Sequence, residues 1–162
     1  MMMAVPQSGP IISSSLAFAN VVKSGDIGMV CASGTGAQEV SCIIDQLGGG
    51  ISQLLGTGGR DLRREIGGIM MKLCLDALIN DPKTKVIAMV SKPPAPEIAA
   101  QILDQAAAGG KPVVVCFIGG DPTEIEKRGL VAACSLEDCA HKAVALSKGE
   151  TPETFDTFSM GC

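Results

Sequence analysis

Five apolar runs alternate along the chain with segments of helical periodicity. The runs cover residues 26–32, 51–55, 85–90, 112–118 and 129–133. Nearly continuous apolar strands that alternate with helices are typical of a parallel sheet covered on both faces. The pattern predicts an α/β fold with a flavodoxin-like, doubly wound and mainly parallel five-stranded sheet. Half of a dinucleotide-binding fold is the alternative architecture that the same pattern allows.

Helices are predicted where apolar residues recur at spacings of three and four. The first predicted helix carries the stripe Val40, Ile43, Ile44 and Leu47. The second, about residues 67–80, is expected to bury Ile66, Met70, Leu73 and Ala77. A third helix follows the prolines at 93–96, and a fourth begins after Ser135. These elements define one domain, residues 25–148, between an N-terminal arm, 1–24, and a C-terminal tail, 149–162.

Composition narrows the class of protein. Apolar residues make up 46% of the chain but aromatic residues only 2%, so the core is expected to be aliphatic. The net charge of −4 and the few aromatic rings argue against a nucleic-acid partner. No apolar run reaches the roughly 18 residues of a membrane span, and the first residues do not resemble a secretory signal. We therefore expect a cytoplasmic protein without a membrane partner.

Metal binding is not predicted. The chain has seven cysteines and one histidine, His141, but no pair of cysteines separated by two residues. A structural zinc site needs four suitably spaced ligands, which this pattern does not supply.

Two glycine-rich turns follow the first two predicted strands and are the main candidates for a binding site. They contain Ser33, Gly34, Thr35 and Gly36, and then Gly58 and Gly59. Helix N-termini and glycine turns expose backbone N–H groups that can hold a phosphate or a carboxylate. Because the carboxyl ends of parallel strands meet at one edge, we expect both turns to converge on one anion. The simpler alternative is that these glycines only form tight turns.

Charged residues beside the turns are expected to complete the site. Arg60 is expected to bind the anion through its guanidinium group, and Lys92 and Asp61 to tune the local charge. In the alternative, Asp61 pairs with Arg60. Arg63 and Arg64 are assigned with Glu65 to a solvated helix face.

The turns do not identify a reaction. The first lacks the third glycine of a dinucleotide-binding turn, since position 39 is Glu39, and NAD binding is therefore not expected. A hydroxyl nucleophile at Ser33 or Thr35 needs a base within hydrogen-bond reach, and His141 lies in the last predicted helix. No catalytic residue is predicted.

Three motifs in order nevertheless resemble a known family. Residues 25–36 resemble the strand, turn and helix that open the CoA-ligase domain of the succinyl-CoA synthetase α subunit. The segments 32–36, 58–62 and 91–96 are most similar to the FdrA family of acyl-CoA synthetase-like proteins, and the likeness spans about residues 16–148. The resemblance implies a domain in which helix N-termini hold a phosphate, or a phosphorylated histidine, at a subunit interface. The synthetases carry that histidine after the fourth strand, where residues 119–129 contain none, so phosphohistidine chemistry is not expected.

The resemblance predicts a subunit or fragment of an FdrA-like acyl-CoA synthetase or ligase. It implies binding of CoA or another phosphorylated ligand, with no covalently bound cofactor. It also implies a homo-oligomer, or a partner subunit that binds CoA or carries a ligase domain. Two alternatives remain open: a subunit of an oxamate carbamoyltransferase-like enzyme in purine (allantoin) catabolism, and a non-catalytic oligomerisation subunit.

Overall fold

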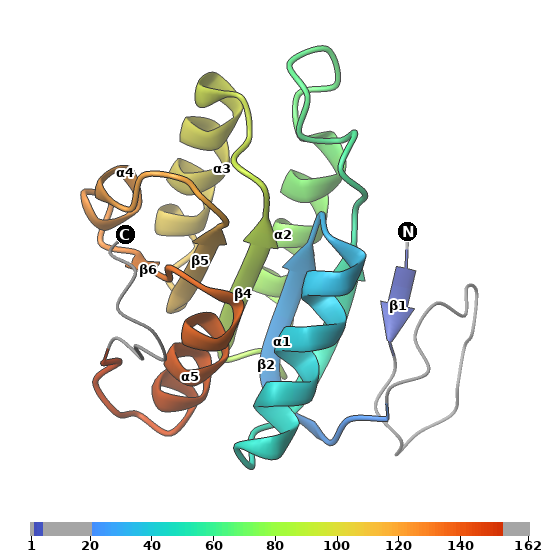
Figure 1. Ribbon diagram of the computed structural model, residues 1–162, viewed down its shortest axis with the longest axis vertical. Helices are drawn as coiled ribbons and strands as arrows, with labels where there is room; N and C mark the ends of the chain where they lie inside the picture. The colour runs from blue at the N-terminus through green and yellow to red at the C-terminus, as the bar shows by residue number, and fades with distance from the viewer. Residues whose placement is uncertain (1, 5–20, 154–162) are drawn as a thin grey trace.

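A single mixed sheet organises the molecule, as the computed structural model of residues 2–4 and 21–153 shows (Figure 1). The strand order is β1-β3-β2-β4-β5-β6. The strands are β1 (Met2–Ala4), β2 (Ser24–Cys31), β3 (Ile51–Gly56), β4 (Val86–Ser91), β5 (Val113–Phe117) and β6 (Val131–Ala132). Strands β2 to β6 run parallel, while β1 pairs antiparallel with β3. The predicted α/β fold with five parallel strands is confirmed, and β1 adds an edge strand.

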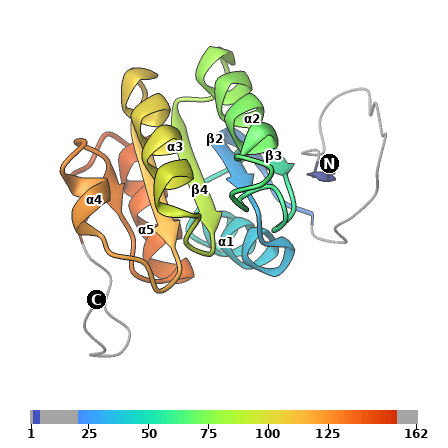
Figure 2. The ribbon, with the colours of Figure 1, turned by 90° about the horizontal axis from the view of Figure 1, so that it is seen from above.

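Helices cover both faces of the sheet. They are α1 (Gly34–Gln46), α2 (Ile69–Asn80), α3 (Pro96–Ala108), α4 (Thr123–Glu126) and α5 (Leu136–Ser147). Figures 1 and 2 show α1 and α5 on one face and α2 and α3 on the other. The one-turn helix α4 was not predicted. None of the helices within 21–153 is long and apolar enough to span a membrane.

Two aliphatic cores lie on the two faces of the sheet. All six residues of β4 are buried, because helices cover the sheet on both sides. Val90 packs in the core under α1 and α5, whereas Met89 packs in the core under α2 and α3. This alternation explains why the strands are apolar at almost every position.

Helix α2 buries a different face from the predicted one. Its buried residues are Met71, Cys74, Leu75 and Leu78. Leu73, which was expected in the core, is 60% exposed, and Ile66 is 40% exposed. The prediction failed because most positions of this helix are apolar, so the spacing alone does not select the face that meets the sheet.

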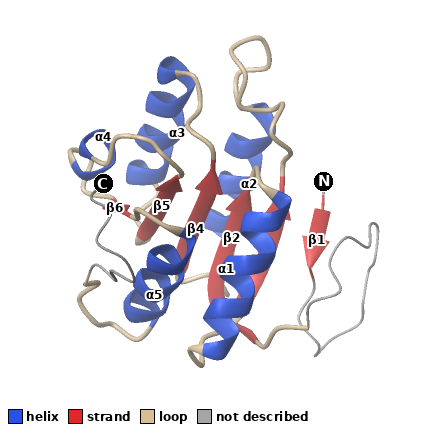
Figure 3. Ribbon diagram, in the orientation of Figure 1, coloured by secondary structure: helices blue, strands red, loops and turns tan. Residues whose placement is uncertain are grey.

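The strand order creates a crevice at one edge of the sheet. The chain passes from β2 to β3 on one side, and then crosses to β4 on the other side of β2. At such a reversal the loops after the two central strands diverge, and ligands of α/β proteins bind there. Figure 3 shows the long loop between β3 and α2 rising above this edge.

Most of the predicted arm, 1–24, and of the predicted tail, 149–162, lies outside the described residues. That division of the chain therefore stays a prediction.

Candidate functional site

A cleft of about 740 Å³ lies at the carboxyl edge of the sheet. Its walls come from the loops that follow β2, β3 and β4. The polar lining consists of Ser33, Gly59, Arg63, Arg64, Glu65 and Lys92. The structure thus brings one residue of each glycine turn, Ser33 and Gly59, to the same cleft.

The first glycine turn forms the N-terminus of α1. The Ser33 hydroxyl caps the helix by accepting a hydrogen bond from the Gly36 N–H, at 3.2 Å. Gly36 is buried, and a Cβ atom there would lie only 3.1 Å from a methyl carbon of Val90. Gly34 and Thr35 are exposed, and their N–H groups have no carbonyl partner within the helix. The turn therefore presents hydrogen-bond donors and the positive end of the helix dipole.

The second loop, residues 57–68, folds around Asp61. Its carboxylate is buried and accepts hydrogen bonds from the N–H groups of Met70, at 2.9 Å, and Met71, at 2.7 Å. Gly68 precedes α2 with a φ of 68° and has no side chain to cap the helix. Asp61 supplies that cap from seven residues upstream, so the structure gives it a structural role.

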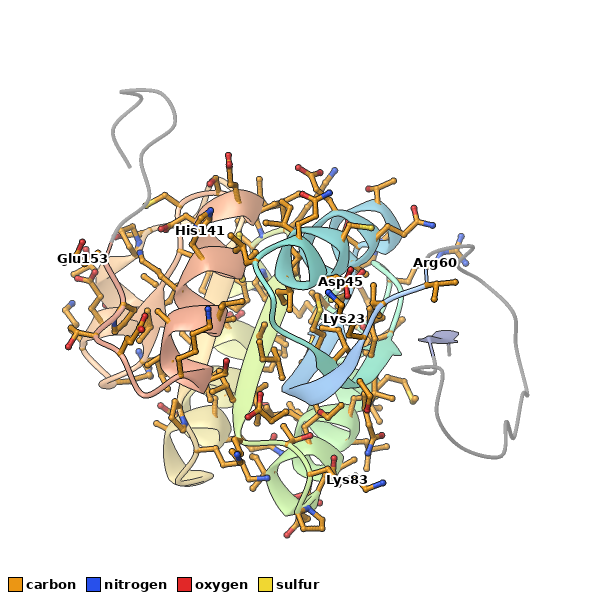
Figure 4. All side chains as sticks on the ribbon, turned by 90° about the horizontal axis from the view of Figure 1, so that it is seen from below. Lys23, Asp45, Arg60, Lys83, His141 and Glu153 are labelled. Atoms are coloured by element: carbon orange, nitrogen blue, oxygen red, sulfur yellow. The ribbon has the colours of Figure 1, made fainter. Side chains whose placement is uncertain are left out.

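Arg60 lies apart from the cleft lining. Its side chain is exposed and points away from the body of the protein (Figure 4). No ion pair joins it to Asp61 in the described part of the chain. The turn that Asp61 stabilises instead directs Arg63 and Arg64 to the cleft. The sequence showed the cluster of arginines, but not which of them the folded loop turns inward.

The charges around the cleft favour an anion. Within residues 21–153, Arg63 and Lys92 make no ion pair, whereas Arg64 lies 2.8 Å from Glu97 at the start of α3. The backbone N–H of Glu97 itself and the Arg64 guanidinium hold the pKa of the Glu97 carboxyl below its usual range. Glu65 adds one further negative charge. The cations around the cleft are therefore Arg63, Arg64 and Lys92, and the carboxylates are Glu65 and Glu97. Of the cations, Arg63 and Lys92 are available to a ligand.

The cleft contains binding groups rather than a nucleophile with its base. Across 2–4 and 21–153, no three histidine, cysteine or acidic residues are grouped so that they could hold a metal ion. His141 lies on α5 (Figure 4) and does not belong to the lining of the cleft. The catalytic residues stay unassigned.

A cleft at the reversal point of a parallel sheet, with a helix N-terminus and exposed cations, is the arrangement of an anion-binding α/β domain. Comparison with known families shows which family of such domains matches. Residues 22–119 match the CoA binding domain family, and the chain belongs to that family.

One curated relative is the "uncharacterized protein YahF" of Escherichia coli (strain K12). The two are 47% identical over 162 residues, which are 99% of this chain and 31% of YahF. The chain thus spans less than a third of the length of that relative.

Two solved structures share the fold. One is the dinucleotide-forming acetyl-coenzyme A synthetase 1 of Ca. Korarchaeum cryptofilum, in complex with phosphate and ADP. It has a TM-score of 0.59 and 20% identity, over 79% of this chain and 31% of that chain. The other is PH0766 of Pyrococcus horikoshii OT3, with a TM-score of 0.58 and 14% identity, over 76% of this chain and 28% of that one. These likenesses show that the chain shares the α/β fold of those structures, and a specific relation to FdrA stays a prediction.

Proposed function

We propose that this chain is the anion-binding unit of an acyl-CoA synthetase or ligase-type enzyme. Its cleft would hold a phosphate-bearing ligand, such as an acyl phosphate or the pyrophosphate of CoA. One observation carries the proposal: the loops after β2, β3 and β4 meet at one cleft that contains two cations, Arg63 and Lys92, with no ion-pair partner in the described part of the chain. Membership of the CoA binding domain family supports it.

Residues of the cleft and of the two glycine turns beside it bind the anion in different ways. The N–H groups of Gly34 and Thr35 and the backbone of Gly58 and Gly59 donate to the anion. We propose that Arg63 takes the role that the sequence suggested for Arg60. Fixed donors and cations stabilise negative charge on a reacting phosphoryl or acyl group without having to reorient during the reaction.

The reacting partner group would come from outside this region, either from further domains or from partner subunits. YahF is about three times as long as the matched region, since that region is 31% of it. Such an enzyme would therefore carry further domains, or partner subunits, that supply the remaining catalytic groups and close the cleft.

Calorimetric titration with inorganic phosphate, acetyl phosphate and CoA tests the proposal. A charge-assisted hydrogen bond contributes about 1.5–3 kcal/mol, so Arg63→Ala is expected to weaken binding by about tenfold or more. Arg60→Ala is the matched control and should change the affinity by less than about twofold, because its side chain lies outside the cleft. Absence of heat with all three ligands would overturn the proposal, and equal losses in both variants would overturn the assignment to Arg63.

A non-catalytic oligomerisation subunit is the second candidate, and one observation favours it. Ile69 and Leu73 lie on the outer side of α2 and are 57% and 60% exposed. Adjacent exposed apolar side chains are typical of protein contact surfaces. The carbamoyltransferase alternative receives no support from the comparisons, and a titration with carbamoyl phosphate would test it directly.

A further inference from the structure

Among the residues that the structure describes, two buried hydroxyl groups have no hydrogen-bond partner. They are the Oγ1 of Thr57 and the Oγ of Ser91, both closed to solvent. Nearly all buried polar atoms in folded proteins are hydrogen-bonded, because leaving one unpaired costs free energy. Two such atoms near one cleft therefore require an explanation.

The strand register places both hydroxyls on either side of Ala32. Cys31 stands opposite Gly56 on β3 and opposite Val90 on β4. One residue further along each strand are Ala32, Thr57 and Ser91. The pairing continues there, since Thr57 N–H donates to Cys31 O and Ala32 N–H donates to Val90 O, each at 2.9 Å.

The side chains of Ala32, Thr57 and Ser91 point towards the face of the sheet under α2 and α3. Leu55 and Met89, two residues before Thr57 and Ser91, pack in the core on that face, and side chains two apart on a strand share a face. Ala32 lines the cleft and packs against the same core. Thr57 and Ser91 therefore flank Ala32, which lines the cleft.

Only one small side chain lies between the two hydroxyl groups. Adjacent strands are about 4.8 Å apart, so Thr57 and Ser91 lie on strands about 10 Å apart, with only the Ala32 methyl between them. Leu62 lines the cleft and belongs to the same apolar core.

We infer that Ser91 and Thr57 select the end of the ligand opposite its phosphate, and that this end carries a hydrogen-bonding carbonyl group such as a carboxamide. The inference rests on the proposed function, which assigns the phosphate to Arg63, Lys92 and the start of α1. A hydroxyl donates to a carbonyl oxygen and accepts from an amide N–H. An apolar group of the same shape would leave both hydroxyls unpaired, and a site of this kind rejects such an analogue.

Three stable probes separate the two ends of the ligand. Inorganic phosphate reports the anion site alone. Phosphonoacetamide adds a carboxamide, and isobutylphosphonate adds an apolar group of the same shape. We expect the wild-type protein to bind phosphonoacetamide at least about tenfold more tightly than isobutylphosphonate, and Ser91→Ala and Thr57→Val each to reduce that preference severalfold. The affinity for inorganic phosphate should not change.

Thermal unfolding of the free protein supplies a second readout. Removing an unpaired buried hydroxyl relieves its desolvation cost, so Ser91→Ala should raise the Tm by about 2 °C while it weakens phosphonoacetamide binding. Ser52→Ala is the control, because the Ser52 hydroxyl lies 2.6 Å from that of Thr84. That variant should lower the Tm without changing the ligand preference.

The outcomes distinguish this inference from the proposed function. Equal wild-type affinities for the two phosphonates, or a preference that neither variant changes, would overturn the inference while phosphate binding still supports the proposed function. A lower Tm for Ser91→Ala would mean that an ordered water satisfies the hydroxyl, and would also overturn it. Absence of binding by all three probes would overturn both.

Discussion

The carboxylate of Asp61 accepts a hydrogen bond of 2.7 Å from the backbone N–H of Met71, and it thereby joins the loop at the cleft to the start of α2. We expect Asp61→Ala to lower the free energy of unfolding by about 1–2 kcal/mol, because two N–H groups of the helix lose their acceptor. Urea denaturation followed by circular dichroism would measure this loss. Asp76→Ala, at an exposed position of the same helix, is the control and should change little.

The same variant tests how the loop affects the cleft. Without its anchor at Asp61, the loop no longer holds Arg63 in place, and phosphate binding should weaken along with stability. Asp61→Asn retains one side-chain acceptor and is expected to fall between the wild type and Asp61→Ala in both measurements. A destabilised Asp61→Ala protein with unchanged phosphate affinity would contradict this coupling.

Two leucines of α2 provide a direct test of which face of the helix meets the sheet. Leu75 is fully buried, whereas Leu73 is 60% exposed. Leu75→Ala should lower the free energy of unfolding by about 2–5 kcal/mol, and Leu73→Ala by less than about 0.5 kcal/mol. Chemical denaturation of the two variants side by side would decide. The reverse order would restore the face that helical periodicity predicted.

The strands of the sheet could be predicted from the sequence, but the orientation of α2 could not. The strands could be predicted because runs such as residues 86–90 are apolar at every position and end at turn residues. The orientation of α2 could not, because apolar residues lie all round it. In the site, the meeting of Ser33 and Gly59 followed from the topology of a parallel sheet. The choice between Arg60 and Arg63 did not, since it depends on hydrogen bonds that the Asp61 carboxylate accepts from a helix that begins eight residues later.

A buried ion pair lies within α5, and its lysine also binds the edge strand β6. The ammonium group of Lys142 donates to a carboxylate oxygen of Asp138, at 2.8 Å, and to the Ala132 carbonyl, at 2.7 Å. Both side chains are nearly inaccessible to solvent. Lys142→Met should therefore lower the free energy of unfolding by about 3 kcal/mol, because the buried Asp138 carboxylate loses its cation.

The double variant Asp138→Asn with Lys142→Met separates charge from packing. It should regain part of the stability lost in Lys142→Met, since no uncompensated charge then remains. The exposed pair of Lys127 and Glu124 offers a comparison, and Lys127→Met should have no measurable effect. A double variant no more stable than Lys142→Met would show that the lost contacts, rather than the charge, carry the effect.

The carboxyl group of Asp81, which follows α2, should make the free energy of unfolding depend on pH. Partial burial raises its pKa, but the hydroxyl of Thr84, the N–H of Lys83, the Gln53 amide and the charge of Lys111 together lower the pKa below its usual value. The unfolded chain then binds a proton at a higher pH than the folded protein. The ionised Asp81 carboxylate therefore stabilises the folded protein fully above the ordinary carboxyl pKa of about 4. This stabilisation is lost as the pH falls through the lower pKa that Asp81 has in the folded protein.

Urea midpoints measured between about pH 2.5 and 6 would test this dependence. In Asp81→Asn the midpoint should fall less steeply below about pH 4, because the side chain no longer titrates. Wild-type and variant curves that stay parallel throughout this range would contradict the role of Asp81.

Both margins of the sheet are short. The strand β1 has three residues and β6 has two. Long, uncovered edge strands can pair with strands of other chains, and such pairing is a common first step of fibril formation. A parallel sheet this rich in aliphatic residues would be vulnerable to such growth, and margins of two and three residues give an incoming strand little to pair with. The protein is therefore expected to resist fibril formation as long as it remains folded.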